Sequence, residues 1–402
     1  MKKVIILSCN TGQGHNSCAR AIQEYFASKN VSCEICDALS FISKRFAKFI
    51  SWGHSFMYRN FPGLFRWGYR FSKAHTALFH KDSRIYRLLT SGTERMYRHI
   101  VNGGYDTVIC THVFSAIIVT HMLGCHALAV NTAFVATDYT DYPGMGACNL
   151  ERYFIADESL VDDYVRCGVP RQRIIPTGIP VSQKFFEKEE KAEAKNLLQI
   201  EKRNRHLLIM CGSMGCGPIK SILKHLVRGL PEQAEVTVIC GTNQRLYRQL
   251  NRRYGKDGLV HIVGYTDQVS LYMDSADLYL TKPGGISVTE AAAKQLPMLF
   301  VNAVAGCEQY NMDFFTKQHS AITAETPKLL AQKGIHLLHS ETERQSMTGK
   351  LCEYPRPNGA AQIYDKLISL STVEDADRLF QPPQYQNAPA ITGESVCEKH
   401  RL

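Results

Sequence analysis

The sequence lacks a long apolar run: nowhere does it reach about 18 successive apolar residues, the length that a membrane-spanning helix needs. Residues 1–15 contain two lysines and a short apolar stretch, as a signal peptide does, but no small-residue cleavage site follows. The stretch leads instead into a glycine-rich loop at residues 11–15. We therefore predict a buried first strand at residues 4–9, and neither a signal peptide nor a transmembrane helix.

Paired metal-binding cysteines are missing as well. The 14 cysteines are scattered, and many lie in apolar runs. The one close pair, Cys33 and Cys36, has no second pair at the spacing of a zinc site. No aspartate-rich metal site stands out either. These absences favour a cytoplasmic protein with reduced thiols and with neither metal nor cofactor.

Acidic residues are fewer than basic ones. The chain has 37 Asp and Glu against 47 Lys and Arg, and its formal net charge of +10 favours an anionic partner. Such a partner could be nucleic acid, an anionic membrane or a phosphorylated substrate. No acidic residue occurs between Asp37 and Asp82, and both tryptophans of the chain lie in that stretch.

Aromatic and basic side chains alternate through residues 41–80 of this acid-free stretch. One interpretation is a pair of amphipathic helices that pack on the first sheet and turn basic faces outward. We favour a membrane-surface element, in which aromatic rings sit at headgroup level and cations meet anionic lipid. Its lipid-facing residues would include Trp52, Phe56, Phe65 and Trp67. Nucleic acid is a third possibility, but no nucleic-acid-binding motif matches, and we expect no such partner.

The chain opens with the pattern of a strand, a glycine loop, a helix and a second strand, and a similar unit begins near residue 206. Strands that alternate with helices are typical of an α/β protein with parallel sheets. Its 402 residues suit two domains. We predict Rossmann-like domains at residues 1–186 and 205–370, a charged linker at residues 187–204 and a disordered tail at residues 371–402.

The central motif of the second unit is LTKPGGISVTEAAAKQLP, at residues 280–297. A strand that stops at Gly284 and Gly285 just before a helix presents bare N–H groups at the positive helix end, which is a phosphate site. Lys282 adds a cation to this site, and Ser287 and Thr289 add hydroxyl groups. The carboxylate of Glu290 could accept hydrogen bonds from both hydroxyls of a ribose.

Four stretches resemble, in the expected order, the family of monogalactosyldiacylglycerol synthases and processive diacylglycerol glucosyltransferases, within glycosyltransferase family 28. They are TGQGH at residues 11–15, TDY at 137–139, GSMGCG at 212–217, and residues 284–290 followed by 306–311. The resemblance extends over roughly residues 1–370. It implies a GT-B fold, in which the parallel sheets of two Rossmann-like domains face a central cleft.

By this resemblance, His15 removes the proton of the acceptor hydroxyl. At the start of a helix the macrodipole disfavours an imidazolium, which leaves a neutral base near pH 7. Asp138, just past a buried strand, would orient His15 or assist the acceptor hydroxyl, and a turn cap explains it almost as well. Gln13 interrupts the glycine run of the family, so the acceptor contacts of Gly12 and Gly14 stay open.

The donor would lie in the second domain. The resemblance assigns Glu308 and Gln309 to the donor sugar, and we expect both, with Asn311, in a loop after a strand at residues 298–301. The predicted donor-binding residues are Gly212, Ser213, Met214, Gly215, Gly217, Gly264, Tyr265, Lys282, Gly284, Gly285, Ile286, Ser287, Glu290, Glu308, Gln309 and Asn311.

The predicted function is an inverting, metal-independent transfer of glucose or galactose from UDP-glucose or UDP-galactose to diacylglycerol, giving a β-linked glycolipid. The protein would bind peripherally to the anionic inner face of the cell membrane. Three alternatives stay open: a UDP-N-acetylglucosamine 2-epimerase-like enzyme, a transferase for a polyprenyl-linked or other acceptor, and a non-catalytic UDP-sugar sensor. An epimerase acts on a soluble substrate and would need no aromatic and basic membrane segment.

Overall fold

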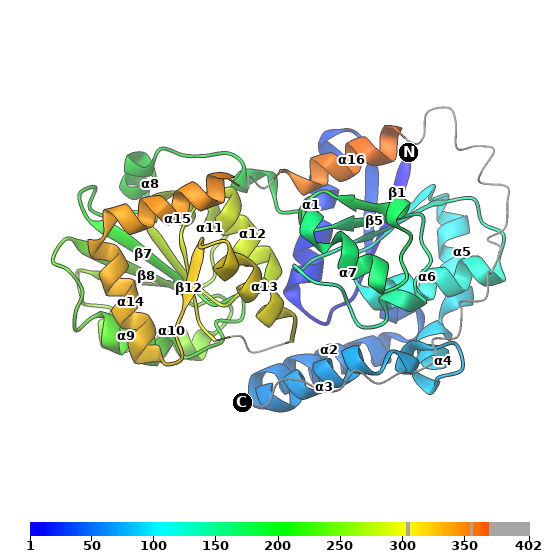
Figure 1. The fold of residues 1–402 in the computed structure, drawn as a ribbon, viewed down its shortest axis with the longest axis horizontal. Coiled ribbons are helices and arrows are strands. Elements are labelled where there is room, and N and C mark those ends of the chain that lie inside the picture. The colour runs from blue at the N-terminus through cyan, green and yellow to red at the C-terminus, as the bar shows by residue number, and fades with distance from the viewer. Residues whose placement is uncertain (303–305, 354–356, 370–402) are drawn as a thin grey trace.

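Two parallel six-stranded sheets, each covered by helices, form the protein (Figure 1). The computed structural model describes residues 1–302, 306–353 and 357–369, so the predicted tail at residues 371–402 lies outside the described residues. The first sheet has the strand order β2-β1-β3-β4-β5-β6 and the second β12-β11-β10-β7-β8-β9. The predicted α/β fold with two Rossmann-like domains is confirmed.

The first domain begins with β1 and continues through β6. Its strands are β1 (Lys3–Ser8), β2 (Ser32–Asp37), β3 (Thr107–Cys110), β4 (Asn131–Val135), β5 (Arg152–Ile155) and β6 (Ile174–Pro176). Its helices are α1 (Gln13–Ser28), α2 (Lys44–Asn60), α3 (Pro62–Ala74), α4 (Arg84–Thr90), α5 (Thr93–Gly103), α6 (Val113–Cys125) and α7 (Val161–Arg166). The short runs of apolar residues form strands because helices cover both faces of a parallel sheet.

The second domain repeats the alternation of strand and helix. Its strands are β7 (Arg205–Met210), β8 (Ala234–Ile239), β9 (Val260–Val263), β10 (Leu278–Thr281), β11 (Met298–Phe300) and β12 (Ala321–Thr323). The helices from residue 191 onward are α8 (Lys191–Leu197), α9 (Ile219–Leu226), α10 (Gln244–Tyr254), α11 (Val269–Ser275), α12 (Gly285–Ala293), α13 (Gly306–Lys317), α14 (Pro327–His339), α15 (Glu341–Glu353) and α16 (Gly359–Ser369).

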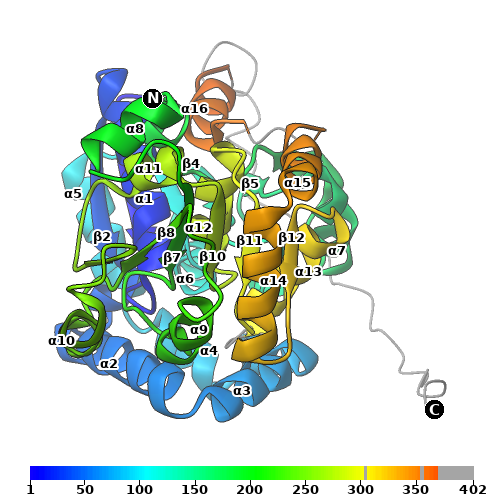
Figure 2. The same cartoon turned by 90° about the vertical axis from the view of Figure 1, so that its left-hand side faces the viewer.

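Helices α2 and α3 form a hairpin along one end of the molecule (Figures 1 and 2). Ser43 caps α2 by accepting hydrogen bonds from the backbone N–H groups of Arg45 and Phe46, and Pro62 begins α3. The outer face of the hairpin exposes large apolar side chains to solvent: Phe49, Trp52, Phe56, Phe61, Leu64, Trp67 and Phe71. The interpretation as a helix pair that simply packs on the first sheet with basic outer faces does not account for these exposed apolar side chains.

No helix in the described ranges is long and apolar enough to cross a membrane.

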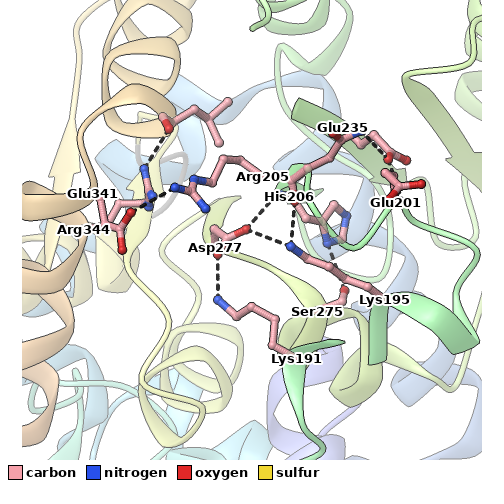
Figure 3. A network of polar contacts seen from close by, with 12 residues as sticks. Lys191, Lys195, Glu201, Arg205, His206, Glu235, Ser275, Asp277, Glu341 and Arg344 are labelled. Carbon is pink, nitrogen blue, oxygen red and sulfur yellow. Dashed lines mark hydrogen bonds and ion pairs between the residues drawn. The ribbon is translucent and has the colours of Figure 1, made fainter. Parts of the chain in front are cut away.

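The segment predicted to link the domains packs on the second one. It contains α8, whose Lys191 and Lys195 form ion pairs with Asp277 at 2.7 and 3.5 Å. Asp277 also accepts a hydrogen bond of 2.9 Å from the backbone N–H of His206, at the beginning of β7 (Figure 3). Burial raises the pKa of Asp277, but the two lysines outweigh it and hold the pKa below its usual value. This carboxylate therefore fixes α8 to the second sheet.

The last described helix, α16, packs on the first domain, although we predicted that all of residues 205–370 belong to the second domain. Ile363 and Leu367 join the apolar cluster that contains α1 and β1, and the ring of Tyr364 meets Phe26 edge-on at 5.3 Å. The sequence of an amphipathic helix predicts that its apolar face is buried, but it does not predict which domain covers that face. The chain therefore crosses between the domains twice.

Candidate active site between the two domains

The predicted catalytic and donor segments meet where the carboxyl ends of the two sheets face each other. Asp138 follows β4, and its Oδ1 accepts a hydrogen bond of 2.8 Å from Nδ2 of Asn311 on α13. Oδ1 of Asn311 accepts a hydrogen bond of 2.7 Å from the backbone N–H of Tyr139. Asn311 is fully buried, so its amide holds the domains together in this state. Its predicted contact with the donor sugar stays a prediction.

Gly285, at the first position of α12, lies directly against the first domain. A Cβ atom there would stand 1.9 Å from the carbonyl oxygen of Thr137 and 2.9 Å from Oδ1 of Asp138, so only glycine fits. On the next residue, the side chain of Ile286 would lie 3.6 Å from a Cβ placed on Gly14. The N-terminus of α12 is thus brought next to the loop at residues 11–15.

His15 lies in the first turn of α1 with its imidazole oriented by the backbone. Its Nδ1 is 2.7 Å from the carbonyl oxygen of Thr111. A carbonyl only accepts hydrogen bonds, so Nδ1 carries the proton and Nε2 keeps a lone pair. Burial lowers the pKa of His15, and this outweighs the opposing effects of the Asp138 charge and the Thr111 hydrogen bond. The residue is therefore a neutral base near pH 7.

Asp138 reaches His15 through a hydroxyl group. Oγ1 of Thr137 is 3.1 Å from Nδ1 of His15 and 3.3 Å from Oδ2 of Asp138. Burial raises the pKa of Asp138, although the Asn311 hydrogen bond and the His15 charge oppose this. Sequence reasoning missed Thr111 and Thr137 as the direct partners of His15. Their position just after two buried strands was the available signal.

On the donor side, Lys282, Glu308 and Tyr58 form a connected polar group. Lys282 Nζ lies 2.7 Å from Oε1 of Glu308, and the Tyr58 hydroxyl donates to the same oxygen at 2.8 Å. Burial disfavours the Lys282 ammonium, but Glu308 and Tyr58 outweigh burial and raise its pKa, so it stays charged. Tyr58 belongs to the hairpin, and sequence reasoning did not connect that segment with the donor site.

Glu308, Gln309 and Asn311 lie in helix α13, not in the loop that we predicted. Glu308 and Asn311 are buried, whereas the Gln309 amide donates to Asp313 one turn later at 2.9 Å. Residues 306–311, GCEQYN, include glycine and asparagine, which are poor helix formers. Their helical form therefore depends on packing against the residues around them.

The hydroxyls that were expected to meet a phosphate are already engaged. Oγ1 of Thr289 donates to the carbonyl oxygen of Gly285 at 2.7 Å, and Thr289 is buried against Tyr139. Oγ of Ser287 lies 2.7 Å from the Tyr279 hydroxyl. The expected role of Thr289 at a phosphate is therefore wrong for this state, and backbone N–H groups and Lys282 remain for that task.

Glu290 is half-buried in α12 and accepts no hydrogen bond from the described part of the chain. Burial raises the pKa of Glu290 to about 8, and the charge of Lys184 opposes this only in part. The carboxyl is therefore protonated below about pH 8 and ionised above it. The ionised form is the one that accepts two hydrogen bonds from a vicinal diol.

The glycine loop at residues 212–217 follows β7 and covers Lys282. Gly212 has a φ of +68°, and a Cβ there would stand 2.6 Å from Cε of Lys282. Ser213 is exposed, and its backbone oxygen accepts from the N–H of Thr242 at 2.8 Å. The other predicted donor residues of this region, Met214, Gly215, Gly217, Gly264 and Tyr265, lie in the same loop and just after β9.

One group of possible metal ligands occurs in the described ranges. Glu34, Cys36 and His99 place one ligand atom each within 4.8 Å of one another. They come from β2 and α5, and none belongs to the predicted catalytic or donor residues. The site between the domains therefore draws no ligand from this group.

Solved structures share this arrangement. Acinetobacter baumannii MurG superimposes with a TM-score of 0.61, at 14% identity over 92% of this chain and all of that one. A Neisseria meningitidis UDP-GlcNAc 2-epimerase bound to UDP-GlcNAc gives 0.59, at 11% identity over 92% of this chain and all of that one. The two sheets and the glycine-led helix between them define a protein of the GT-B class.

Two family models match the chain, and they divide it as the fold does. Residues 15–181 match the monogalactosyldiacylglycerol (MGDG) synthase family, and residues 206–363 match the glycosyltransferase family 28 C-terminal domain. The predicted resemblance to the monogalactosyldiacylglycerol synthases and processive diacylglycerol glucosyltransferases is confirmed.

Two curated relatives carry the name processive diacylglycerol β-glucosyltransferase. The protein of Staphylococcus epidermidis is 28% identical over 241 residues, which is 59% of this chain and 61% of that protein. The protein of Bacillus mycoides is 26% identical over 396 residues, which is 92% of this chain and 95% of that protein.

Proposed function

We propose that the protein transfers a hexose from a UDP-sugar to diacylglycerol at a membrane surface. The observation that carries the proposal is the position of a neutral His15, with a free Nε2, beside the N-terminus of α12. The relatives named as diacylglycerol β-glucosyltransferases support the acceptor and favour glucose as the sugar. We further propose that the reaction takes place on the cytoplasmic face.

In the proposed reaction, Nε2 of His15 takes the proton of the acceptor hydroxyl while that oxygen attacks the anomeric carbon. The bond between the anomeric carbon and UDP breaks, and its electron pair leaves with the diphosphate. The N–H groups at the start of α12 and the Lys282 ammonium oppose that growing charge, so no metal ion is required in this scheme. Attack from the face opposite UDP gives a β-linked product.

Glu308 would accept hydrogen bonds from hydroxyls of the hexose, and Glu290 from those of the ribose. Contacts such as the Asn311–Asp138 hydrogen bond hold the domains against each other and would exclude water from the donor. Substrate entry then requires the domains to move apart.

The test is transfer of labelled hexose from UDP-glucose and from UDP-galactose into diacylglycerol in mixed anionic vesicles. We expect labelled glycolipid from one of the two donors, with its anomeric configuration read by NMR. Conversion of UDP-N-acetylglucosamine without lipid would support an epimerase instead. This alternative is kept because the Neisseria meningitidis epimerase shares the fold of this chain. Transfer only to a polyprenyl-linked acceptor would leave the donor site and overturn diacylglycerol.

The exposed aromatic face of the hairpin is proposed to bind the lipid surface. Trp52 and Trp67 are each 61% exposed, and Lys44, Arg45 and Lys48 lie on the same helix pair. Replacing both tryptophans by serine should weaken binding to anionic vesicles at least about tenfold, since each ring contributes about 1.5–3 kcal/mol when it leaves water. Binding should also weaken with salt.

Co-sedimentation with vesicles measures this effect. Leu329→Ser is the matched control, because Leu329 is 42% exposed on α14 in the second domain and should leave vesicle binding unchanged. Equal binding of the double variant and the unmodified protein would contradict a lipid-binding role of the hairpin.

A further inference from the structure

The hairpin has an inner face as well as an exposed one. Along α2, Phe49, Trp52 and Phe56 point to solvent, whereas Tyr58 is only 6% exposed. Side chains three, four or seven residues apart share a side of a helix, so the rotation of α2 that exposes the first three turns Tyr58 inward. One rigid helix therefore links the proposed lipid surface to the interior of the protein.

Three residues of the inner face contact the first turns of α13, the helix that carries Glu308. The Tyr58 hydroxyl donates to Oε1 of Glu308 at 2.8 Å. The ring of Tyr69 lies so close to Gly306 that a Cβ there would stand 1.9 Å from it. Lys73 Nζ lies 4.1 Å from the ring centre of Tyr310.

Lys73 also fixes the hairpin to the first domain. Its Nζ forms an ion pair of 2.7 Å with Asp141 and donates to Oγ1 of Thr140 at 3.2 Å. The hairpin thus bridges the acceptor side and the donor side, and Tyr58 is its contact with the carboxylate that the family resemblance assigns to the sugar.

The surroundings of Tyr58 keep its hydroxyl in one place. Phe65 packs edge-on against the Tyr58 ring at 5.8 Å and against His54 at 4.9 Å, so it is half-buried. This position differs from our prediction that Phe65 faces lipid. Lys282 Nζ donates to the Tyr58 oxygen at 3.1 Å, beside its ion pair with Glu308. A hydroxyl that both accepts from Lys282 and donates to Glu308 fixes the relative position of these two charges.

We infer that Tyr58 is a positioning residue of the donor-sugar site, and that through Tyr58 the binding of the hairpin to lipid strengthens donor binding. The inference rests on the proposed function, because it assumes that Glu308 meets the hexose and that the outer face meets lipid. A lipid surface that holds the outer face fixes the rotation of α2, and with it the hydroxyl that orients Glu308.

The test is calorimetric titration of UDP-glucose, UDP-galactose and UDP into the full chain and into Tyr58→Phe. Each titration is run with and without phosphatidylglycerol vesicles that contain no diacylglycerol. The unmodified protein should bind one UDP-hexose about tenfold more tightly with vesicles, whereas Tyr58→Phe should show no such gain. About tenfold is the effect expected from one hydrogen bond to a charged group. UDP, which lacks the hexose, should bind both proteins equally.

Two further variants separate positioning from a general structural effect. Tyr86→Phe removes the hydroxyl of another buried tyrosine, which lies 3.3 Å from Nδ1 of His121 outside the interface, and should behave as the unmodified protein. The double variant Trp52→Ser, Trp67→Ser should keep the vesicle-free affinity and lose the gain.

The outcomes divide as follows. The inference would be overturned if Tyr58→Phe and the unmodified protein bound UDP-hexose equally tightly in the presence of vesicles. It would also be overturned if vesicles did not change the UDP-hexose affinity of the unmodified protein. A vesicle-dependent gain that Tyr58→Phe abolishes would support it even if no sugar reaches diacylglycerol, in which case only the proposed acceptor fails.

Discussion

Replacing His15 by alanine is expected to lower the rate of hexose transfer by about 100- to 10,000-fold, the range that a general base contributes. The imidazole is held by the Thr111 carbonyl, and its Nε2 has a lone pair for the proton of the acceptor. The affinity for UDP should stay unchanged, because His15 contacts the acceptor side.

The measurement is the initial rate of labelled hexose transfer into vesicle lipid, with UDP affinity determined separately by calorimetry. His336→Ala is the matched control: this histidine is exposed on α14, pairs with Glu343 and should have no effect. The burial-lowered pKa of His15 sets the sign of the pH dependence, since protonation at low pH removes the base. Activity of the unmodified protein should therefore fall only when the pH drops below about 6.5, the ordinary pKa of a histidine, because the pKa of His15 is lowered from that value. Full activity of His15→Ala would refute the mechanism.

Replacing Lys282 by methionine is expected to lower the free energy of unfolding by about 3–5 kcal/mol, the usual cost of removing one partner of a buried ion pair. Glu308 is 3% exposed, and the variant would remove the ammonium that lies 2.7 Å from this buried carboxylate. Binding of a UDP-hexose should weaken as well, because the ammonium lies beside the predicted phosphate site.

Urea unfolding followed by circular dichroism measures this loss. Lys256→Met is the control, since Lys256 is exposed after α10 and should change stability by less than about 0.5 kcal/mol. The double variant Lys282→Met, Glu308→Gln should recover most of the loss, because it removes both charges. A cost of less than about 1 kcal/mol for Lys282→Met would mean that water, which reaches 19% of its side chain, screens the pair.

The sheets could be predicted because each strand signals itself locally. Residues 4–7 and 207–209 are continuous apolar runs, which is what a strand covered on both faces requires, and the structure buries every one of them. Strand β10 ends at Thr281, and Gly284 and Gly285 stand at the N-cap and the first position of α12, so the expected turn from strand to helix is present.

Contacts between distant segments could not be predicted in this way. Tyr58 and Glu308 are 250 residues apart, and nothing near either residue names the other. The same limit applies to Thr111, whose backbone oxygen orients His15 whatever its side chain is. For α13, turn-forming residues hid a helix that depends on partners from the hairpin and from the loop after β4.

The two crossings of the chain between the domains lie side by side. Gln183 and Asn358 share a hydrogen bond of 2.6 Å there, and a Cβ on Gly359 would stand 2.7 Å from the carbonyl oxygen of Gly178. Two adjacent connections resist sliding and twisting of one domain against the other far more than a single connection does. We therefore expect the domains to open about this edge, which would leave one path for the proposed nucleotide to enter and leave. Loosening this edge should therefore change how fast the proposed nucleotide exchanges, although the edge lies outside the predicted catalytic and donor residues.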